Sequence, residues 1–331
     1  MTITELLESV RRVEVRTNRL VNDMMVGAYL SRFKGRGMDF EELREYMPGD
    51  DIRDIDWNVT NRMGRPFVKR FREERELAVV LAVDVSASSA FGSLRRTKRE
   101  FAAEIAGTLA VSAARSSDKV ALLLFTDQVE LYVPPRKGRR HILRILREML
   151  SFEPKQRGTN IPAAMTFLNH VMRRRSIVFL LTDFLHSFGT NEAHPHPSSS
   201  SSKSLGGKLE DERRDRGRGG LNHSRDVIQE LGLTNAHHDL VCLHLHDPRE
   251  SELPNAGLVT VEDAETGEVL ELDSGRAAVR EKFAHTNAAR LEALDLAFNR
   301  AGVDTLRFNT AEAFAQTLQR FFETRRGRRR G

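Results

Sequence analysis

Residues 76–88 have the sequence ELAVVLAVDVSAS. Their apolar run, Leu77–Val83, is seven residues long without a polar interruption, which is typical of a strand buried on both faces of a parallel sheet. The run ends in a carboxylate followed by a serine at each second position. A chain that leaves a strand in extended form keeps alternate residues on one side, so Asp84, Ser86 and Ser88 are expected to converge at one edge of the sheet.

The pattern of a short apolar run followed by a helical stretch repeats along the chain. The further predicted strands are Val120–Phe125, Ile177–Leu181, Leu240–Leu245 and Thr305–Phe308. The segments with helical spacing are Thr97–Ser116, Arg139–Leu150, Ile161–Arg174, Arg225–Leu233, Ala277–Ala301 and Ala311–Arg326. Alternation of strand and helix predicts an α/β fold with a doubly wound, mostly parallel, Rossmann-type sheet over residues 76–326.

Two more oxygen-bearing residues are expected at the same edge of this sheet. Asp183 follows the run that begins at Ile177, and Thr159 lies in a glycine-containing loop that opens a predicted helix. Hydroxyl and carboxylate oxygens with two negative charges suit Mg²⁺ or Mn²⁺ better than Zn²⁺. The sequence therefore predicts a metal site, with one or more positions open to water or to a foreign carboxylate. The alternative is that these are ordinary turn and cap residues. The predicted metal ligands are Asp84, Ser86, Ser88, Thr159 and Asp183.

The rest of the chain divides by composition. Residues 1–34 have the spacing of an amphipathic helix that begins with a capping box, Thr2 to Glu5. Residues 35–75 are rich in turn signals and predict a small β subdomain. Residues 186–222 are dominated by Ser, Gly, Pro and charge, which predicts a disordered insertion. Residues 327–331 form a basic tail.

Two groups of motifs resemble known families. The Asp84-x-Ser86-x-Ser88 motif together with Thr159 and Asp183 resembles the metal-ion-dependent adhesion site (MIDAS) of von Willebrand factor A domains. One departure is Asn160, where such domains often have an acidic residue after the threonine. Upstream, residues 37–57, GMDFEELREYMPGDDIRDIDW, followed by Val68-Lys69, resemble the bacterial "domain of unknown function 58" family, whose members pair this block with such an A domain.

This resemblance implies a function. Members of the family are commonly encoded beside MoxR-type AAA+ ATPases, which implies a non-enzymatic, magnesium-dependent protein-binding module with a chaperone-like adaptor role in protein or complex maturation. An acidic residue of the protein partner would complete the shell of the metal. The alternative is a metal-dependent phosphoester hydrolase that uses the same site. The sequence nominates no general base for it, and it contains no P-loop, nucleophile elbow or dinucleotide fingerprint.

Composition narrows the partners and the compartment. Lys and Arg number 52 against 47 Asp and Glu, a net charge of +5, and five arginines lie in the last seven residues. The remainder is neutral, so no nucleic-acid partner is expected. Cys242 is the single cysteine, which favours a reducing, cytoplasmic location. No apolar run approaches the roughly 20 residues of a membrane helix, so no integral membrane segment is expected.

Two further clusters have structural and metal-binding interpretations. Four aspartates lie between Asp50 and Asp56, and turn caps and ion pairs are favoured over a second metal site. Trp57 is expected to anchor the β subdomain on the A domain. His244 and His246 share one face of a predicted strand, but no Cys-x-x-Cys or His-Glu-x-x-His motif accompanies them, which favours ordinary strand residues over zinc ligands.

Overall fold

The structure is a computed structural model, and it describes residues 37–74, 77–93, 96–185 and 226–327. The predicted helix over residues 1–34, the predicted insertion 186–222 and the tail beyond Gly327 lie outside the described residues.

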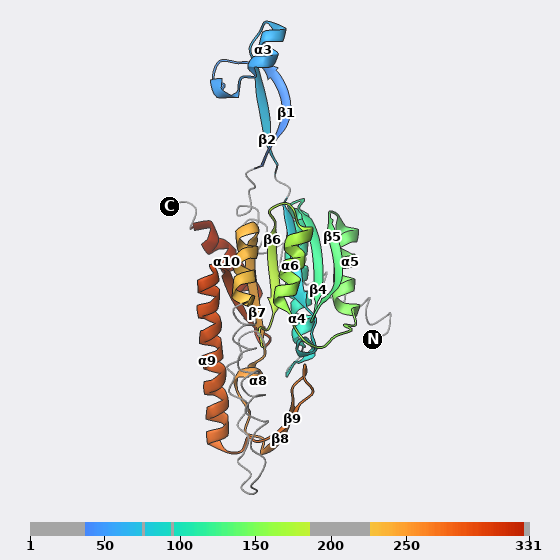
Figure 1. Ribbon diagram of the computed structural model, residues 1–331, viewed down its shortest axis with the longest axis vertical. Coiled ribbons are helices and arrows are strands. Elements are labelled where there is room, and N and C mark those ends of the chain that lie inside the picture. Colours follow the sequence, from blue (N-terminus) through green and yellow to red (C-terminus); the bar gives the residue numbers. More distant parts are fainter. Residues whose placement is uncertain (1–36, 75–76, 94–95, 186–225, 328–331) are drawn as a thin grey trace, which may run out of the picture.

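A six-stranded sheet with the order β10-β7-β6-β3-β4-β5 forms the centre of the fold (Figure 1). Its strands are β3 (Ala78–Asp84), β4 (Lys119–Phe125), β5 (Val129–Arg136), β6 (Ile177–Thr182), β7 (Asp239–His246) and β10 (Asp304–Asn309). All neighbours pair in parallel except β4 and β5, which are antiparallel. The chain proceeds outward from β3 in one direction and then in the other, so the predicted doubly wound, mostly parallel α/β sheet is confirmed.

Helices cover both faces of this sheet. One face packs on α4 (Lys98–Arg115), α5 (Arg139–Ser151) and α10 (Ala315–Gly327). The other packs on α6 (Ile161–Val171), a helix over residues 226–237 and α9 (Ala277–Ala301). Strand β3 shows why its run is continuously apolar: Leu81 belongs to the first core and Ala82 to the second, and neither is exposed to solvent.

Three strands were not predicted. β5 contains Pro134 and Pro135, and it is tolerated as a strand because it lies at the sheet edge, where fewer backbone amides must donate. β8 (Leu258–Glu262) and β9 (Val269–Asp273) form a separate antiparallel hairpin. Most of their side chains are exposed or half-buried, so they lack the apolar run of a core strand.

The block that resembles the family signature forms a second small unit. Strands β1 (Gly37–Glu45) and β2 (Phe67–Glu74) pair antiparallel, and the connection holds η2 (Ile52–Asp54) and α3 (Trp57–Met63). Figure 1 places this unit beyond one end of the sheet and the β8–β9 hairpin beyond the other. The prediction that Trp57 anchors the unit on the A domain is wrong, because its side chain is 60% exposed.

The aspartates of this unit act as caps and ion-pair partners. Asp56 accepts hydrogen bonds from the first backbone amides of α3, and Asp51 caps η2. Asp50 pairs with Arg44, with 2.6 Å between Oδ1 and Nη2. The interpretation as turn caps and ion pairs is confirmed for these three residues.

Arg325 has a structural role near the C-terminal end of the predicted α/β domain. It lies in α10, is 9% exposed and forms ion pairs with Asp239, at 2.8 Å, and with Asp304. It therefore joins α10 to the ends of two strands. None of the helices in the described part of the chain is both long enough and apolar enough to cross a membrane.

Candidate metal centre

The five predicted metal ligands lie together at the carboxyl edge of the sheet. Strands β3 and β6 are parallel neighbours, so the residues that follow them meet at that edge. The side chains of Asp84, Ser86, Ser88 and Asp183 are buried, and that of Thr159 is half-buried. This placement follows from strand order and brings two carboxylates and three hydroxyls into one small region.

The loop after β3 is held by its own polar groups. Asp84 Oδ1 accepts a hydrogen bond from the Ser86 amide at 2.9 Å, which closes a tight turn and aims both side chains at the edge. The hydroxyls of Ser86 and Ser88 are 3.1 Å apart. The Ala87 amide donates to the carbonyl oxygen of Arg157 at 2.9 Å, which fastens this loop to the one that contains Thr159.

The loop that presents Thr159 brings the backbone of Gly158 close to the Asp127 carboxylate. The Gly158 amide donates to Asp127 Oδ2 at 3.1 Å, and a Cβ atom on Gly158 would lie 2.2 Å from Asp127 Oδ1. Asn160 then caps α6, because its Oδ1 accepts from the Ala163 amide at 3.0 Å. The residue that departs from the MIDAS pattern therefore has a structural role here.

Two supporting residues were not predicted. Thr182 Oγ1 donates to Asp84 Oδ2 at 2.6 Å. Lys98 Nζ lies 2.6 Å from Asp183 Oδ2 and also contacts Glu250 Oε1. The position of Lys98 could have indicated this contact. A lysine in the first turn of a helix interacts unfavourably with the helix dipole, so an acidic partner nearby is expected.

The surroundings of Asp84 and Asp183 shift their pKa values in opposite directions. Burial and the nearby charge of Asp183 raise the pKa of Asp84 to about 6. Burial also opposes ionisation of Asp183, but the ammonium of Lys98 outweighs it and holds the pKa of that carboxyl below its usual value. Lys98 therefore compensates the charge of Asp183, whereas ionised Asp84 adds negative charge to a buried site.

A third carboxylate reaches the site from a distant part of the sequence. Glu265 lies in the turn between β8 and β9, and its Oε1 accepts a hydrogen bond from Thr159 Oγ1 at 2.9 Å. Burial, with repulsion from Asp84 and Asp183, raises its pKa to about 7. No sequence signal pointed to Glu265, because nothing in a hairpin 106 residues away from Thr159 indicates where it folds.

This donor set fits a hard divalent cation. Hydroxyl and carboxylate oxygens converge, and burial together with repulsion among the carboxylates opposes the ionisation of Asp84 and Glu265, which a bound cation would favour. Within the described ranges, no group of three or more His, Cys, Asp and Glu side chains has ligating geometry, so the hydroxyls are essential to this set. His244 and His246, with ring centroids 5.8 Å apart, form no such group there either.

Comparison with known sequences finds one family and uncharacterized relatives. A model of the family described as "Protein of unknown function DUF58" matches residues 42–205 and 219–293. An uncharacterized protein of Mycobacterium tuberculosis is 28% identical over 324 residues, which cover 97% of this chain and 90% of that protein. One of Mycobacterium avium is 26% identical over 196 residues, which cover 59% of this chain and 94% of that protein.

The similar solved structures are remote. The hypothetical protein BatB from Bacteroides thetaiotaomicron has 13% identity and a TM-score of 0.44, over 75% of this chain and 98% of that one. An aerotolerance-related membrane protein from Bacteroides fragilis has the same identity and TM-score, over 76% and 99%. The SpRpn10 VWA domain has 10% identity and a TM-score of 0.33, over 73% and 94%.

Proposed function

Because the chain belongs to the DUF58 family, whose model matches more than half of it, and because five oxygen donors converge at its sheet edge, we propose that it is a non-enzymatic, Mg²⁺-dependent protein-binding module. The observation that carries the proposal is the meeting of Asp84 and Asp183 with three hydroxyls. Ser86, Ser88 and Thr159 would offer hydroxyl oxygens to Mg²⁺ or Mn²⁺. Asp84 and Asp183 would supply charge directly or through water. When bound, the ion would supply an open coordination position for an acidic side chain of a protein partner.

The surrounding residues support this function by holding the donors in place. Thr182 and the Ser86 amide orient the two oxygens of Asp84. Lys98 Nζ donates a hydrogen bond to Oδ2 of Asp183, and the Leu185 amide donates one to Oδ1. Hydrogen bonds of this kind fix the orientation of the ligands.

A MoxR-type AAA+ ATPase is the proposed partner, in the maturation of proteins or complexes. Support comes from the resemblance of residues 37–57 to a family commonly encoded beside such ATPases. The proposed compartment is the cytoplasm, from the single cysteine, Cys242, which is buried. No nucleic acid is proposed as a partner.

The test uses the full chain and the MoxR-type ATPase of the same organism in a titration calorimeter. We expect binding with Mg²⁺ and none with EDTA, and we expect Asp84→Ala and Asp183→Ala to remove it. Asp56→Ala, which removes a cap in the distant β1–β2 unit, is the control and should bind normally. Equal binding with Mg²⁺ and EDTA would contradict the proposal.

One observation favours a second candidate function, a metal-dependent phosphoester hydrolase. A general base works best with a pKa near the operating pH, and Glu265, with a pKa of about 7, is such a carboxylate at the site. The test is a screen of phosphomonoesters and phosphodiesters with Mg²⁺ or Mn²⁺. Turnover that is lost in both Asp84→Ala and Glu265→Gln would replace the binding function with this one.

A further inference from the structure

Two carboxylate oxygens from distant parts of the sequence lie beside the Thr159 hydroxyl. Thr159 Oγ1 lies 2.9 Å from Glu265 Oε1 and 3.3 Å from Asp84 Oδ2. A threonine hydroxyl has one proton, so it can donate to only one of these carboxylates at a time. The Thr182 hydroxyl already donates to Asp84 Oδ2. Thr159 Oγ1, Glu265 Oε1 and Asp84 Oδ2 thus lie close together, and a cluster of hydroxyl and carboxylate oxygens suits a cation.

The turn that carries Glu265 is ordered by its own hydrogen bonds. Asp263 Oδ1 accepts from the Glu265 amide at 2.9 Å and from the Thr266 amide at 3.3 Å. The Gly267 amide donates to the Asp263 carbonyl oxygen at 2.7 Å, and Gly267 has a φ of +73°, which glycine adopts without strain. The turn therefore holds the Glu265 backbone in one conformation.

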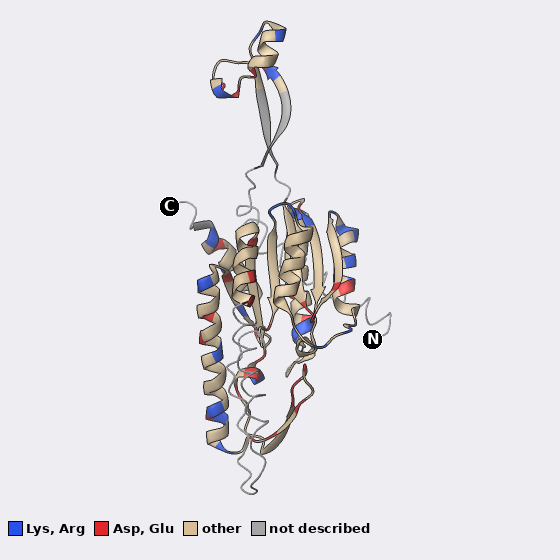
Figure 2. Cartoon of the chain, in the orientation of Figure 1, with Lys and Arg blue, Asp and Glu red and all other residues tan. Residues whose placement is uncertain are grey.

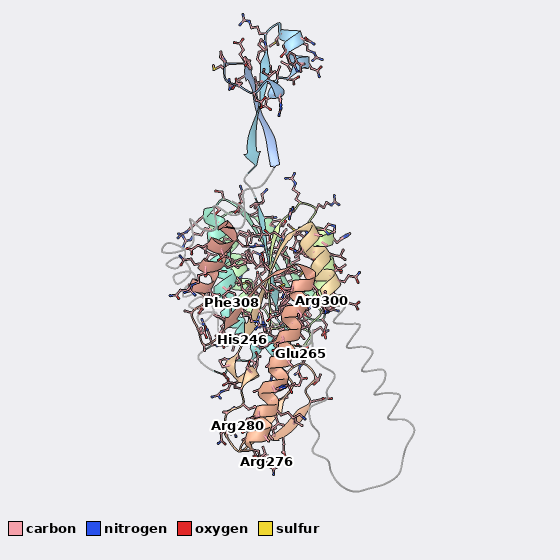
Figure 3. All side chains as sticks on the ribbon, turned by 90° about the vertical axis from the view of Figure 1, so that its left-hand side faces the viewer. His246, Glu265, Arg276, Arg280, Arg300 and Phe308 are labelled. Atoms are coloured by element: carbon pink, nitrogen blue, oxygen red, sulfur yellow. The ribbon has the colours of Figure 1, made fainter. Side chains whose placement is uncertain are left out.

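The hairpin is fastened at its base and lightly attached elsewhere. The Ser274 hydroxyl donates to the Gly257 carbonyl oxygen at 2.8 Å, and Arg280 of α9 donates to the Ser274 carbonyl oxygen at 2.7 Å. In contrast, Leu258 and Val269 on the two strands are 69% and 62% exposed. Figure 3 shows Arg276 and Arg280 at one end of this part of the molecule and Glu265 farther along, toward the central sheet. The tip can leave the site without exposing a buried apolar core.

We propose that Glu265 is a built-in carboxylate ligand of the metal site, so that the β8–β9 hairpin closes the site from within the same chain. This inference rests on the proposed function and deepens it: Glu265 holds the position that an acidic residue of a partner would take. A partner must displace the hairpin tip before it can bind.

A groove beside the contact between Glu265 and Thr159 offers a route by which a partner could reach the site. It is lined by Asp127, Lys155, Gln156, Arg157, Gly158, Glu265 and Thr266. Lys155 and Arg157 are exposed on the loop before Thr159. In Figure 2, red segments mark acidic residues along the β8–β9 hairpin. Lys155 and Arg157 can attract an acidic segment of a partner, which would exchange with Glu265 at the same ligand position.

The first test measures Mn²⁺ binding to the full chain by calorimetry and by water-proton relaxation. We expect Glu265→Gln to weaken Mn²⁺ binding by about tenfold or more and to raise the relaxation per bound Mn²⁺, because water replaces the carboxylate. Added acetate should lower that relaxation in Glu265→Gln and leave the wild type unchanged. Glu268→Gln, at an exposed position of the same turn, is the matched control and should behave as wild type.

The second test measures amide hydrogen exchange with and without Mg²⁺. We expect Mg²⁺ to slow exchange of residues 263–268 in the wild type and not in Glu265→Gln. Wild-type Mn²⁺ affinity, relaxation and Mg²⁺-dependent protection in Glu265→Gln would overturn this inference and leave the proposed function standing. Failure of the wild type to bind Mn²⁺ or Mg²⁺ at all would overturn both.

Discussion

The Nζ atom of Lys98 lies 2.6 Å from Oδ2 of Asp183, and the two side chains are 2% and 5% exposed. The protein thus places a permanent ammonium beside one of the two carboxylates of its proposed metal site. Asp183 keeps its charge with or without a bound cation. A bound divalent cation would therefore mainly compensate the charges of Asp84 and Glu265, because burial opposes the ionisation of these two side chains.

Loss of the Lys98 ammonium should destabilise the fold. Lys98→Met leaves Asp183 and Glu250 as buried carboxylates without their shared counter-charge. Removal of one partner from a buried ion pair costs about 3–5 kcal/mol. We expect a loss of that size in the free energy of unfolding, measured by urea denaturation in EDTA. Lys155→Met, at an exposed position, should change it by less than about 0.5 kcal/mol. A similarly small effect in Lys98→Met would contradict the assignment of Lys98 as the counter-charge.

Divalent cations should stabilise the folded chain. A ligand that binds only the folded state at ten times its Kd adds about 1.4 kcal/mol, which is a rise in Tm of roughly 2–4 °C or less. Mg²⁺ and Mn²⁺ should produce this rise over an EDTA control in a thermal melt. Asp84→Ala and Asp183→Ala should abolish it, whereas Asp56→Ala should lower the starting Tm through its lost cap and keep the rise. If millimolar Mg²⁺ or Mn²⁺ does not change the Tm of the wild type, the proposed metal site is contradicted.

The close approach at Gly158 should control the position of Thr159. In Gly158→Ala the new Cβ would overlap the Asp127 carboxylate, so the Asp127 side chain or the loop must shift and the hydrogen bond from the Gly158 amide is strained. We expect Mn²⁺ affinity to fall by about tenfold, as for other losses of support behind a ligand. Calorimetry measures it.

The matched control for this change is Gly232→Ala. Gly232 lies within the helix 226–237 and has an open neighbourhood, since the nearest atom to an added Cβ is 4.0 Å away. It should leave Mn²⁺ affinity unchanged and raise stability by up to about 1 kcal/mol through helix propensity. Normal Mn²⁺ binding in Gly158→Ala would show that the loop can move without loss of the site.

Acid should destabilise the protein through His244. This side chain is 1% exposed, and neither ring nitrogen has a hydrogen-bond partner among the described residues. Burial, with repulsion from His246, Arg290 and Arg307 that outweighs the attraction of Asp183, lowers the pKa of His244 to about 3. Between pH 6.5 and about 3 the unfolded chain binds a proton that the folded chain does not. Stability therefore falls with decreasing pH, by up to about 1.4 kcal/mol per unit.

The measurement is the free energy of unfolding against pH. His244→Phe keeps a ring against Phe184 and should reduce the slope below pH 6.5, whereas His285→Phe, at an exposed position on α9, should keep it. Asp84 acts in the opposite direction, because its raised pKa makes stability fall as pH rises from about 4 to about 6. The difference between wild type and His244→Phe cancels that contribution. Parallel curves for these two proteins would contradict the role of His244.

The sequence by itself determined five of the six strands of the sheet and the core of the site. Leu77–Val83 is apolar without interruption because both faces of β3 are covered by helices, so burial alone marks the strand. Asp84 and Asp183 directly follow two such strands. Parallel strands end at a common edge, so their convergence could be predicted from local pattern and from fold class.

Only the tertiary structure decided which groups surround those carboxylates. Lys98, Glu250 and Glu265 come from α4, α8 (Pro248–Ser251) and the β8–β9 turn, and they meet the site through long-range packing that no periodicity records. Trp57 shows the reverse error, since a large aromatic suggested an anchor and its side chain is mostly exposed. A burial pattern is local and is visible in a sequence. The distance between two charged side chains depends on how whole helices and strands pack together. The local sequence around each side chain does not contain that information.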